Sequence, residues 1–283
     1  MVTVKIPFLD ILKVADSGQA FRIKVIDGSH VELVAFGRYL QIAKTSEDTY
    51  SFSCSEKEFR EIWAEYLDLG RNYEAIVDSI DANDDYLMKA ASFGSGIRIL
   101  KQEVFETTIS YIISQRRSIP SITTSVERIS ALCGRKITVP DLKAPFVRPL
   151  CKEYYAFPTP EELSNLAFDK LESTGVGYRA PYIARAAEEF ASGKLDPSSL
   201  AMLSDEDLYK ALTGMFGVGT KVANCIMLFA FARTGRFPVD VWIQRIEDRY
   251  YGGHFDCSPY PDTAGIMQQF MFYYERRKDS AIN

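Results

Sequence analysis

Two side chains in one short stretch have the types and spacing needed for a covalent reaction. Lys221 follows a glycine turn, Gly217-Val218-Gly219, and Asp240 lies 19 residues further on, after Pro238. A neutral lysine amine is a nucleophile, and the positive pole of a helix N-terminus disfavours the charged form of a lysine there. An aspartate that caps a helix is held rigidly and can stabilise nearby positive charge. The pair predicts a lysine nucleophile assisted by a carboxylate; taken singly, the residues fit an exposed lysine and an ordinary helix cap.

The turn before Lys221 is predicted to join two helices. The first covers 205–213, and the second begins near Val218, which makes the unit a helix-hairpin-helix. Gly217 and Gly219 let the backbone approach a partner, and the free N–H groups of the second helix favour an anion such as a DNA phosphate. The loop carbonyls could hold Na⁺ or K⁺ beside the same phosphate, and the candidates are those of Thr213, Met215 and Val218.

The elements ahead of this stretch fall into two kinds. Residues 20–55 alternate apolar and polar side chains in four runs separated by turn signals, which predicts a small antiparallel sheet. A turn is predicted at Asp16-Ser17-Gly18-Gln19, before the sheet, and Ser55 with Glu58 predicts a capping box after it. Helical periodicity then predicts helices over 73–81, 83–93, 101–115, 119–132, 159–165, 178–191, 205–213, 218–231, 241–250 and 263–277.

These patterns predict an α+β fold with two domains. A β-rich N-terminal domain covers residues 1–95, and an all-α helix-hairpin-helix domain covers 96–283, with a glycine-rich junction at Phe93-Gly94-Ser95-Gly96. The last helix could pack back on the first domain. The proline-rich stretch 136–158 is predicted to be a long loop.

Composition narrows the classes of protein. No signal peptide and no run approaching the roughly 18 apolar residues of a membrane span are present. The chain has five scattered cysteines, no CxxC pair and two histidines, which argues against zinc and iron–sulfur sites and for reduced thiols. We expect a cytoplasmic, nucleoid-associated monomer that has no cofactor beyond the cation suggested above and no membrane partner.

Charge is unevenly distributed. The net charge of −5 argues weakly against a nucleic-acid partner. Acidic residues outnumber basic ones by twelve to four over 45–90, whereas over 97–136 seven basic residues face three acidic ones. A DNA-binding protein needs only one basic face. A solvated surface with scattered charges is the alternative explanation.

The motifs together resemble one family of DNA repair enzymes. The pattern L-x-G-x-x-G-V-G-x-K-V-A-x-C, followed by P-V-D-V, resembles the 8-oxoguanine DNA glycosylase/AP lyases of the helix-hairpin-helix-GPD superfamily. The resemblance covers nearly the whole chain. Further matching elements are Ser17-Gly18-Gln19-Ala20-Phe21-Arg22, Gly175-Val176-Gly177-Tyr178-Arg179-Ala180, and Ala264-Gly265 with Gln268 and Phe272.

The resemblance implies roles around a flipped base. Duplex DNA with an oxidised guanine would be the partner, and the damaged nucleotide would be extruded into a pocket. The carbonyl of Gly18 would accept the N7–H that distinguishes 8-oxoguanine from guanine. Gln268 would read the Watson–Crick edge, and Phe272 and Cys225 would sandwich the purine. Without the resemblance, Gly18 would be an ordinary turn residue, and Cys225 and Phe272 ordinary core residues.

The resemblance also implies the reaction. Lys221 would attack C1′ and expel the base, and the resulting imine would permit β-elimination of the 3′ phosphate. Asp240 would stabilise the developing positive charge and assist proton transfers. Tyr178 and Arg179 would wedge into the base stack and contact the orphaned base.

The sequence departs from the animal members at the DNA face. In Gln115-Arg116-Arg117, two arginines replace asparagines, and Ser121 replaces an arginine that reads the opposite cytosine. We therefore predict a weaker opposite-base preference. Trp242 replaces a histidine, and it would stack near the DNA backbone or fill the core. The absence of a C-terminal four-cysteine cluster argues against the endonuclease III and adenine-mismatch branches.

Two alternative functions remain open at this point. A monofunctional glycosylase for alkylated bases such as 3-methyladenine would share the fold, but such enzymes lack a lysine where Lys221 stands. A non-enzymatic helix-hairpin-helix DNA-binding protein would bind phosphates without a base pocket, and it would leave Gly18, Gln268 and Phe272 unexplained. Too few histidines and clustered carboxylates are present for a metal-dependent hydrolase.

Overall fold

The N-terminal part is built on a five-stranded antiparallel sheet. The computed structural model describes residues 1–280, with side chains through Lys278. The strands lie in the order β1-β5-β4-β3-β2, and the bounds are β1 (Val2–Lys5), β2 (Ile23–Val25), β3 (His30–Ala35), β4 (Arg38–Ser46) and β5 (Thr49–Phe52). The period-two prediction is therefore confirmed. The edge strand β1 was not predicted, although its side chains alternate; its partner is β5, which lies far along the sequence.

A short helix lies between β1 and β2, and a longer helical segment follows the last strand of the sheet. Helix α1 (Ile11–Asp16) begins at Asp10, whose carboxylate accepts the N–H groups of Leu12 and Lys13. The predicted capping box after the sheet is half formed. The Ser55 hydroxyl accepts the Glu58 N–H, but Oε1 of Glu58 accepts the indole N–H of Trp63 at 3.0 Å. Residues 56–66 form one helical segment made of α2 (Glu56–Glu58), η1 (Phe59–Trp63) and α3 (Ala64–Tyr66).

The rest of the chain is helical, as predicted. All ten helices expected there are present, and most begin up to three residues later than expected. Two short ones, α9 and α11, were missed, and 136–158 contains a two-stranded ribbon rather than only loop. The bounds are α4 (Tyr73–Asp78), α5 (Asp85–Gly94), α6 (Val104–Ile113), α7 (Ile119–Cys133), β6 (Lys136–Ile137), β7 (Tyr154–Tyr155), α8 (Pro160–Ser164), α9 (Phe168–Leu171), η2 (Glu172–Val176), η3 (Gly177–Arg179), α10 (Ala180–Ala191), α11 (Pro197–Ala201), α12 (Asp205–Thr213), α13 (Thr220–Phe229), α14 (Val241–Tyr250) and α15 (Ala264–Ser280).

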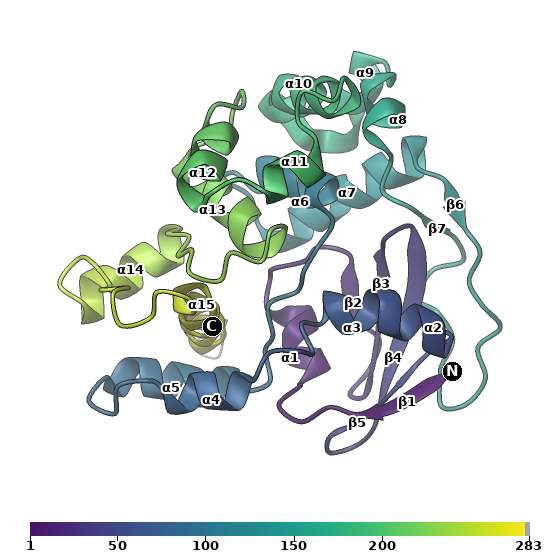
Figure 1. The fold of residues 1–283 in the computed structure, drawn as a ribbon. Coiled ribbons are helices and arrows are strands. Elements are labelled where there is room, and N and C mark those ends of the chain that lie inside the picture. Colours follow the sequence, from purple (N-terminus) through teal and green to yellow (C-terminus); the bar gives the residue numbers. More distant parts are fainter. Residues whose placement is uncertain (281–283) are drawn as a thin grey trace.

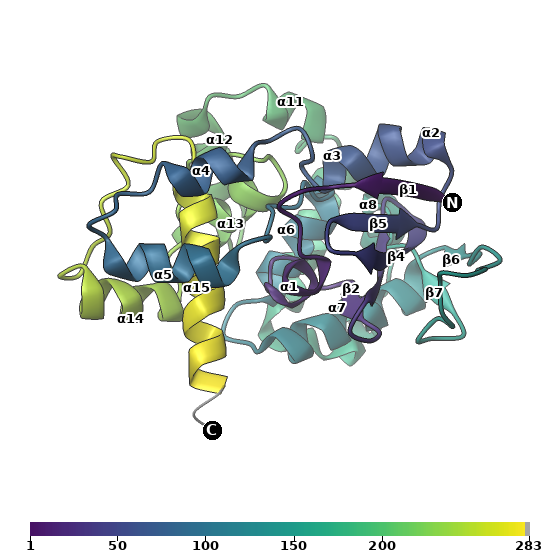
Figure 2. The ribbon, with the colours of Figure 1, turned by 90° about the horizontal axis from the view of Figure 1, so that it is seen from below.

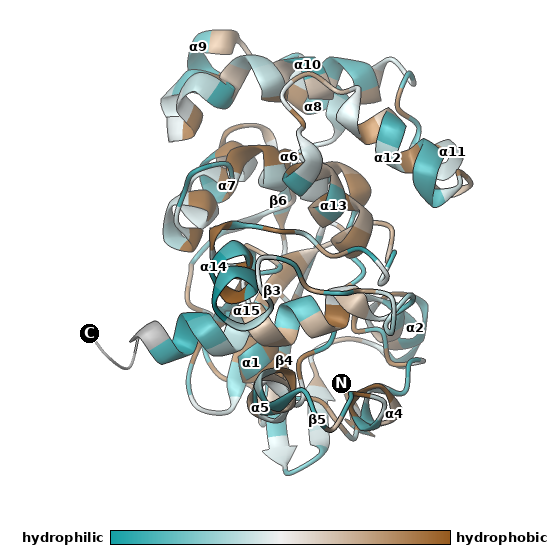
Figure 3. Ribbon diagram, turned by 90° about the vertical axis from the view of Figure 1, so that its left-hand side faces the viewer, coloured by the Kyte–Doolittle hydropathy of each residue, from teal (hydrophilic) through white to brown (hydrophobic). Residues whose placement is uncertain are grey.

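The buried apolar side chains of the described residues form two large clusters and a small third one, in which Val34 and Tyr39 pack with Ile137 and Tyr154 of the β6–β7 ribbon. One large cluster lies between the sheet and the segment 56–67, and the other joins the helices from α4 to α15. Hydrophobic segments of α6, α7 and α13 lie close together at the centre of the helical part (Figure 3). Helix α15 crosses α5 and packs against it (Figure 2), where Gly94 leaves room for the Phe270 ring. The domain boundary at residue 95 stays a prediction, but α4 and α5 belong to the helical core.

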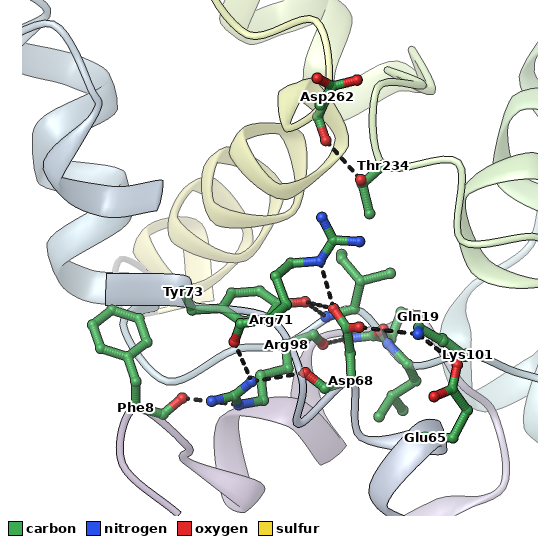
Figure 4. A network of polar contacts seen from close by, with 12 residues as sticks. Phe8, Gln19, Glu65, Asp68, Arg71, Tyr73, Arg98, Lys101, Thr234 and Asp262 are labelled. Carbon is green, nitrogen blue, oxygen red and sulfur yellow. Dashed lines mark hydrogen bonds and ion pairs between the residues drawn. The ribbon is translucent and has the colours of Figure 1, made fainter. Parts of the chain in front are cut away.

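A polar network ties the two parts together where the chain crosses between them (Figure 4). The buried Arg98 guanidinium donates to the carbonyls of Pro7, Phe8 and Asp68, and it lies 4.7 Å from the centroid of the Tyr73 ring. The Asp68 carboxylate accepts the Tyr73 hydroxyl at 2.9 Å. Charge-assisted hydrogen bonds of this kind are about twice as strong as neutral ones. The segment after Arg98 is thereby held in place.

A second buried cluster holds the sheet against α6 and α7. Arg22 pairs with Glu127 at 3.3 Å, and Glu106 lies 4.0 Å from the same guanidinium. Burial raises the pKa of Glu106 to about 8; Arg22 opposes this effect, and Glu103 and Glu127 add to it. Burial also acts against the charge of Glu127, but its ion pairs with Arg22 and Lys24 hold the pKa of Glu127 below its usual range.

The raised pKa of Glu106 predicts a pH-dependent loss of stability. Between about pH 4.5 and about pH 8 the native state binds more protons than the unfolded chain, so stability falls as pH rises through this window. Glu106→Gln removes the fall. We expect the melting temperature of the variant to exceed that of the wild type by several degrees at pH 8.5 and by less than ~2 °C at pH 5.5. Glu127→Gln is the control with the opposite sign, since it loses ion pairs at pH 8.5. Parallel profiles for Glu106→Gln and wild type would contradict the assignment.

Candidate active site

The glycine hairpin places Lys221 in the first turn of α13. Gly217 has a φ of +82°, and a Cβ there would lie 2.3 Å from the Tyr182 ring, so the fold itself requires this glycine. Gly219 is the N-cap of α13, and a Cβ there would meet nothing within 4 Å. The open space beside Gly219 leaves the helix N-terminus accessible to an anion.

The amine of Lys221 lies among partners from α6 and from its own helix. Nζ donates to Oγ of Ser114 at 3.4 Å and stands 5.3 Å from the centroid of the Tyr111 ring. Cys225, one turn further along α13, is buried. Burial raises the pKa of the Cys225 thiol; Lys221 opposes the effect and Asp240 adds to it. The amine, the thiol and the carboxylate are therefore close enough to influence one another.

Asp240 caps α14, as predicted. Its Oδ1 accepts the N–H groups of Trp242 at 2.9 Å and Ile243 at 3.0 Å. Oδ2 has no hydrogen-bond partner among the side chains described, through Lys278, and belongs to a half-buried side chain. One oxygen thus fixes the carboxylate, while the second remains available to a charge that develops in the cavity.

One cavity brings the predicted catalytic and base-binding residues together. Its volume is about 840 Å³, and its walls come from the Gly18 turn, the α6–α7 connection, α13, α14 and α15. Its lining includes Gly18, Lys221, Cys225, Asp240, Gln268 and Phe272. These residues span more than 250 positions of the sequence, so only the fold assembles them.

Gly18 is fixed from both sides. It has a φ of +80°, and a Cβ there would lie 2.8 Å from Cδ1 of Ile119 and 3.3 Å from the Phe272 ring. The preceding carbonyl, that of Ser17, accepts the amide of Gln269 at 2.9 Å. The amide of Gln19 bonds to the carbonyl of Arg98 at 2.9 Å and to the N–H of Leu100 at 2.7 Å. The backbone of Gly18 is therefore held against the Phe272 ring.

Gln268 presents a free acceptor to the cavity. Its Nε2 donates to the carbonyl of Pro238 at 3.2 Å, while Oε1 is buried with no partner among residues 1–280. A buried polar atom without a partner costs free energy, which a ligand with a matching N–H would recover. Oε1 of Gln268 is therefore available to accept a hydrogen bond from a donor in the cavity.

The predicted DNA-binding residues divide into exposed and internal ones. Tyr178 is exposed, and its ring packs edge-on against Tyr182, which in turn contacts the exposed Phe216 at the hairpin tip. Arg116 is exposed, with a φ of +53°. Trp242 lines the cavity and lies 5.4 Å from the Arg245 guanidinium, so it does not fill the core.

The other predicted DNA contacts connect loops within the protein. The Gln115 amide donates to the carbonyl of Gly217 at 3.1 Å, and Arg179, which is buried, donates to the carbonyl of Gln115. Arg117 donates to Oγ of Ser121 at 2.9 Å and to the carbonyl of Gly175 at 3.0 Å. Gln115, Arg117 and Arg179 thus hold three loops together, and their predicted contacts with DNA stay predictions.

Sequence reasoning missed several cavity residues. Tyr111 and Ser114 contact Lys221, and Arg276 lines the cavity one turn beyond Phe272. The only signal for Arg276 is its spacing of four from Phe272 on α15. Within residues 1–280, no group of three or more His, Cys, Asp or Glu side chains is placed to hold a metal ion. The Na⁺ or K⁺ site at the hairpin stays a prediction; the carbonyl of Met215 accepts the Val218 N–H at 3.1 Å.

The fold and the cavity define the class of the protein. A helix-hairpin-helix leads into a lysine, and a helix-capping aspartate faces the same cavity. Residues 109–268 match the model of the HhH-GPD superfamily base excision DNA repair proteins. Residues 1–108 match the model of the 8-oxoguanine DNA glycosylase N-terminal domain. The chain belongs to the 8-oxoguanine DNA glycosylase family within that superfamily.

Individual relatives agree with this assignment. A probable N-glycosylase/DNA lyase of Methanothermobacter thermautotrophicus is 30% identical over 226 residues, which cover 70% of this chain and 68% of that protein. The N-glycosylase/DNA lyase of Saccharomyces cerevisiae is 37% identical over 167 residues, which cover 55% of this chain and 42% of that protein. The 8-oxoguanine glycosylase/lyase of Clostridium acetobutylicum, solved with double-stranded DNA containing cytosine opposite 8-oxoguanine, superposes with a TM-score of 0.87, 29% identity and 99% coverage of both chains.

The crowding around Gly18 predicts a measurable cost of adding one methyl group. Gly18→Ala forces a side chain into a left-handed backbone and against Ile119 and Phe272. We expect the free energy of unfolding in urea to fall by about 1–3 kcal/mol. Gly28→Ala is the matched control, since a Cβ at Gly28 meets nothing within 4 Å, and we expect a change below about 0.5 kcal/mol. Equal stability of the two variants would show that Gly18 is not held as described.

Proposed function

We propose that the protein is a bifunctional DNA glycosylase and AP lyase that excises 8-oxoguanine from duplex DNA in base excision repair. The observation that carries the proposal is the single cavity in which Lys221 and Asp240 meet Gly18, Gln268 and Phe272. The cavity volume of about 840 Å³ is sufficient for a flipped nucleotide. The named activities of the similar proteins above, and the complex of the Clostridium enzyme with damaged DNA, support it.

Base recognition follows from two acceptors and one ring. The carbonyl of Gly18 accepts the N7–H of 8-oxoguanine, whereas the bare N7 of guanine would leave two acceptors facing each other. Oε1 of Gln268 accepts from the N–H donors of the Watson–Crick edge. Phe272 stacks on one face of the purine, and Cys225 contacts the other. Because both acceptors are held by internal hydrogen bonds, little reorganisation accompanies binding.

The Lys221 amine and the Asp240 carboxylate have separate roles in the reaction. The neutral amine of Lys221 forms a bond to C1′, and the C1′–N9 bond breaks with its electron pair going to the base. Oδ2 of Asp240 stabilises the positive charge on the sugar. Loss of the amine proton and opening of the sugar give an imine, and removal of a C2′ proton then expels the 3′ phosphate. The strand is thereby nicked.

The DNA face is proposed to combine the hairpin with the exposed loops. The N–H groups at Gly219 and the first turn of α13 bind a backbone phosphate, and a Na⁺ or K⁺ ion at the hairpin carbonyls reinforces this contact. Tyr178 enters the base stack, and Arg116 reaches the duplex at the α6–α7 connection. None of the helices described is long and apolar enough to span a bilayer. We propose a monomer that acts in the cytoplasm at the nucleoid.

Covalent trapping tests the nucleophile. Borohydride reduction during reaction with 8-oxoguanine duplex is expected to yield a protein–DNA adduct for wild type and none for Lys221→Gln, because glutamine cannot form the imine. Lys210→Gln is the matched control, since Lys210 lies in the same helix-hairpin-helix but is exposed and paired with Glu206. Release of free base without any adduct would favour a monofunctional glycosylase, and binding without base release would favour a plain DNA-binding protein.

The opposite-base preference is tested with four duplexes. Ser121 has a short side chain whose hydroxyl already accepts from Arg117, so it cannot make the bidentate contact of an arginine to a base. One such contact gives about 1–3 kcal/mol of discrimination. We expect single-turnover excision rates opposite the four bases to differ by less than about tenfold. A preference for cytosine above about a hundredfold would contradict this and would assign the reading to Arg116.

A further inference from the structure

The base cavity contains a half-buried cation that the reaction described above does not use. Arg276 lies four residues after Phe272 on α15 and lines the cavity. Its guanidinium carbon is 5.6 Å from the centroid of the Phe272 ring, and a Cβ on Gly18 would lie 3.5 Å from its Nη1. Only 18% of the side chain is exposed. The guanidinium therefore lies beside both groups that are proposed to hold the purine.

Arg276 is anchored by the end of α1. Its Nη2 donates to the carbonyl of Asp16 and pairs with the carboxylate of Asp16 at 3.2 Å. Arg277 pairs with the same carboxylate but is exposed, and it does not line the cavity. The Arg276 and Arg277 guanidinium groups thus share the Asp16 carboxylate, but only that of Arg276 lines the cavity. Arginine remains charged even when it is buried.

A guanidinium beside the purine could stabilise charge that develops during the reaction. When the C1′–N9 bond breaks, its electron pair stays with the purine, so negative charge develops on the base while Lys221 forms the new bond to C1′ and releases a proton. Asp240 stabilises only the positive charge on the sugar and not the negative charge on the base. Fixed charges in a partly dehydrated site stabilise developing charge more strongly than water does.

We propose that Arg276 is the cation that stabilises the negative charge on the leaving purine. Asp16 holds the guanidinium next to Gly18 and Phe272, so the charge is in place before the base enters. The inference rests on the proposed function, because it concerns the same cavity and the same bond. Arg276 would thus stabilise charge on the base, as Asp240 is proposed to do on the sugar.

The two activities of the protein separate this role from a purely structural one. Arg276→Met is expected to slow single-turnover release of 8-oxoguanine by about 10- to 100-fold. Strand cleavage at a preformed abasic site has no leaving base, and its rate is expected to stay within about threefold of wild type. Arg276→Lys keeps the charge and is expected to retain most of the base release. Arg277→Met removes the neighbouring Asp16 ion pair and is expected to leave both rates unchanged.

A leaving-group series provides a second readout that a change in packing would not move. Base release is measured for purines that differ in the acidity of N9, with wild type, Arg276→Met and Arg277→Met. We expect a steeper dependence of log rate on acidity in Arg276→Met alone, because that variant stabilises the anion less. Equal slopes, or equal losses of base release and abasic cleavage, would overturn the inference. Wild-type protein that releases no 8-oxoguanine would instead refute the proposed function.

Discussion

The hydrogen bonds of one buried glutamine constrain the whole recognition site. Gln19 is almost completely buried, and its side-chain amide bonds to the backbone of the crossing segment at Arg98 and Leu100. Its backbone carbonyl accepts the Tyr111 hydroxyl at 3.1 Å. Leaving a buried amide unpaired costs about twice what one such bond contributes, so displacement of the turn is disfavoured. The crossing segment is in turn fixed by Arg98. Gly18 therefore takes its position from the sheet, the helical core and the connection between them.

A second set of internal hydrogen bonds fixes the loops that are proposed to contact DNA. Gln115 holds the hairpin at Gly217, Arg179 holds the carbonyl of Gln115, and Arg117 holds Gly175. Three loops from distant parts of the chain are thus tied before any DNA arrives. Such prior ordering lowers the entropic cost of binding, which a protein of net charge −5 cannot offset by general attraction to phosphate. Local attraction to phosphate is proposed instead for the exposed Arg116 at the α6–α7 connection.

The sequence predicted what local physics determines. The alternation of residues 20–55, the glycine hairpin and the cap at Asp240 depend on neighbours along the chain, and all three are present. Features decided by distant partners were not predictable. Glu58 bonds to Trp63 instead of completing a capping box, and α5 joins the helical core because α15 packs on it. The hydrogen bonds of Gln115 and Arg179 were not predictable for the same reason, because their acceptors are backbone carbonyls of other loops.

Helix α15 shows why the cavity needs the rest of the fold. Gln268, Phe272 and Arg276 are spaced by four residues, so one helix face presents an acceptor, a ring and a cation. The orientation of this face is set from behind, where Phe270 is fully buried and contacts α5 at Gly94. It is set again from the side, where Gln269 holds Ser17 and Arg276 holds Asp16. A rotation of α15 would move all three groups together and would break both contacts, so the edge reading, stacking and charge stabilisation proposed for these groups all depend on the position of one helix.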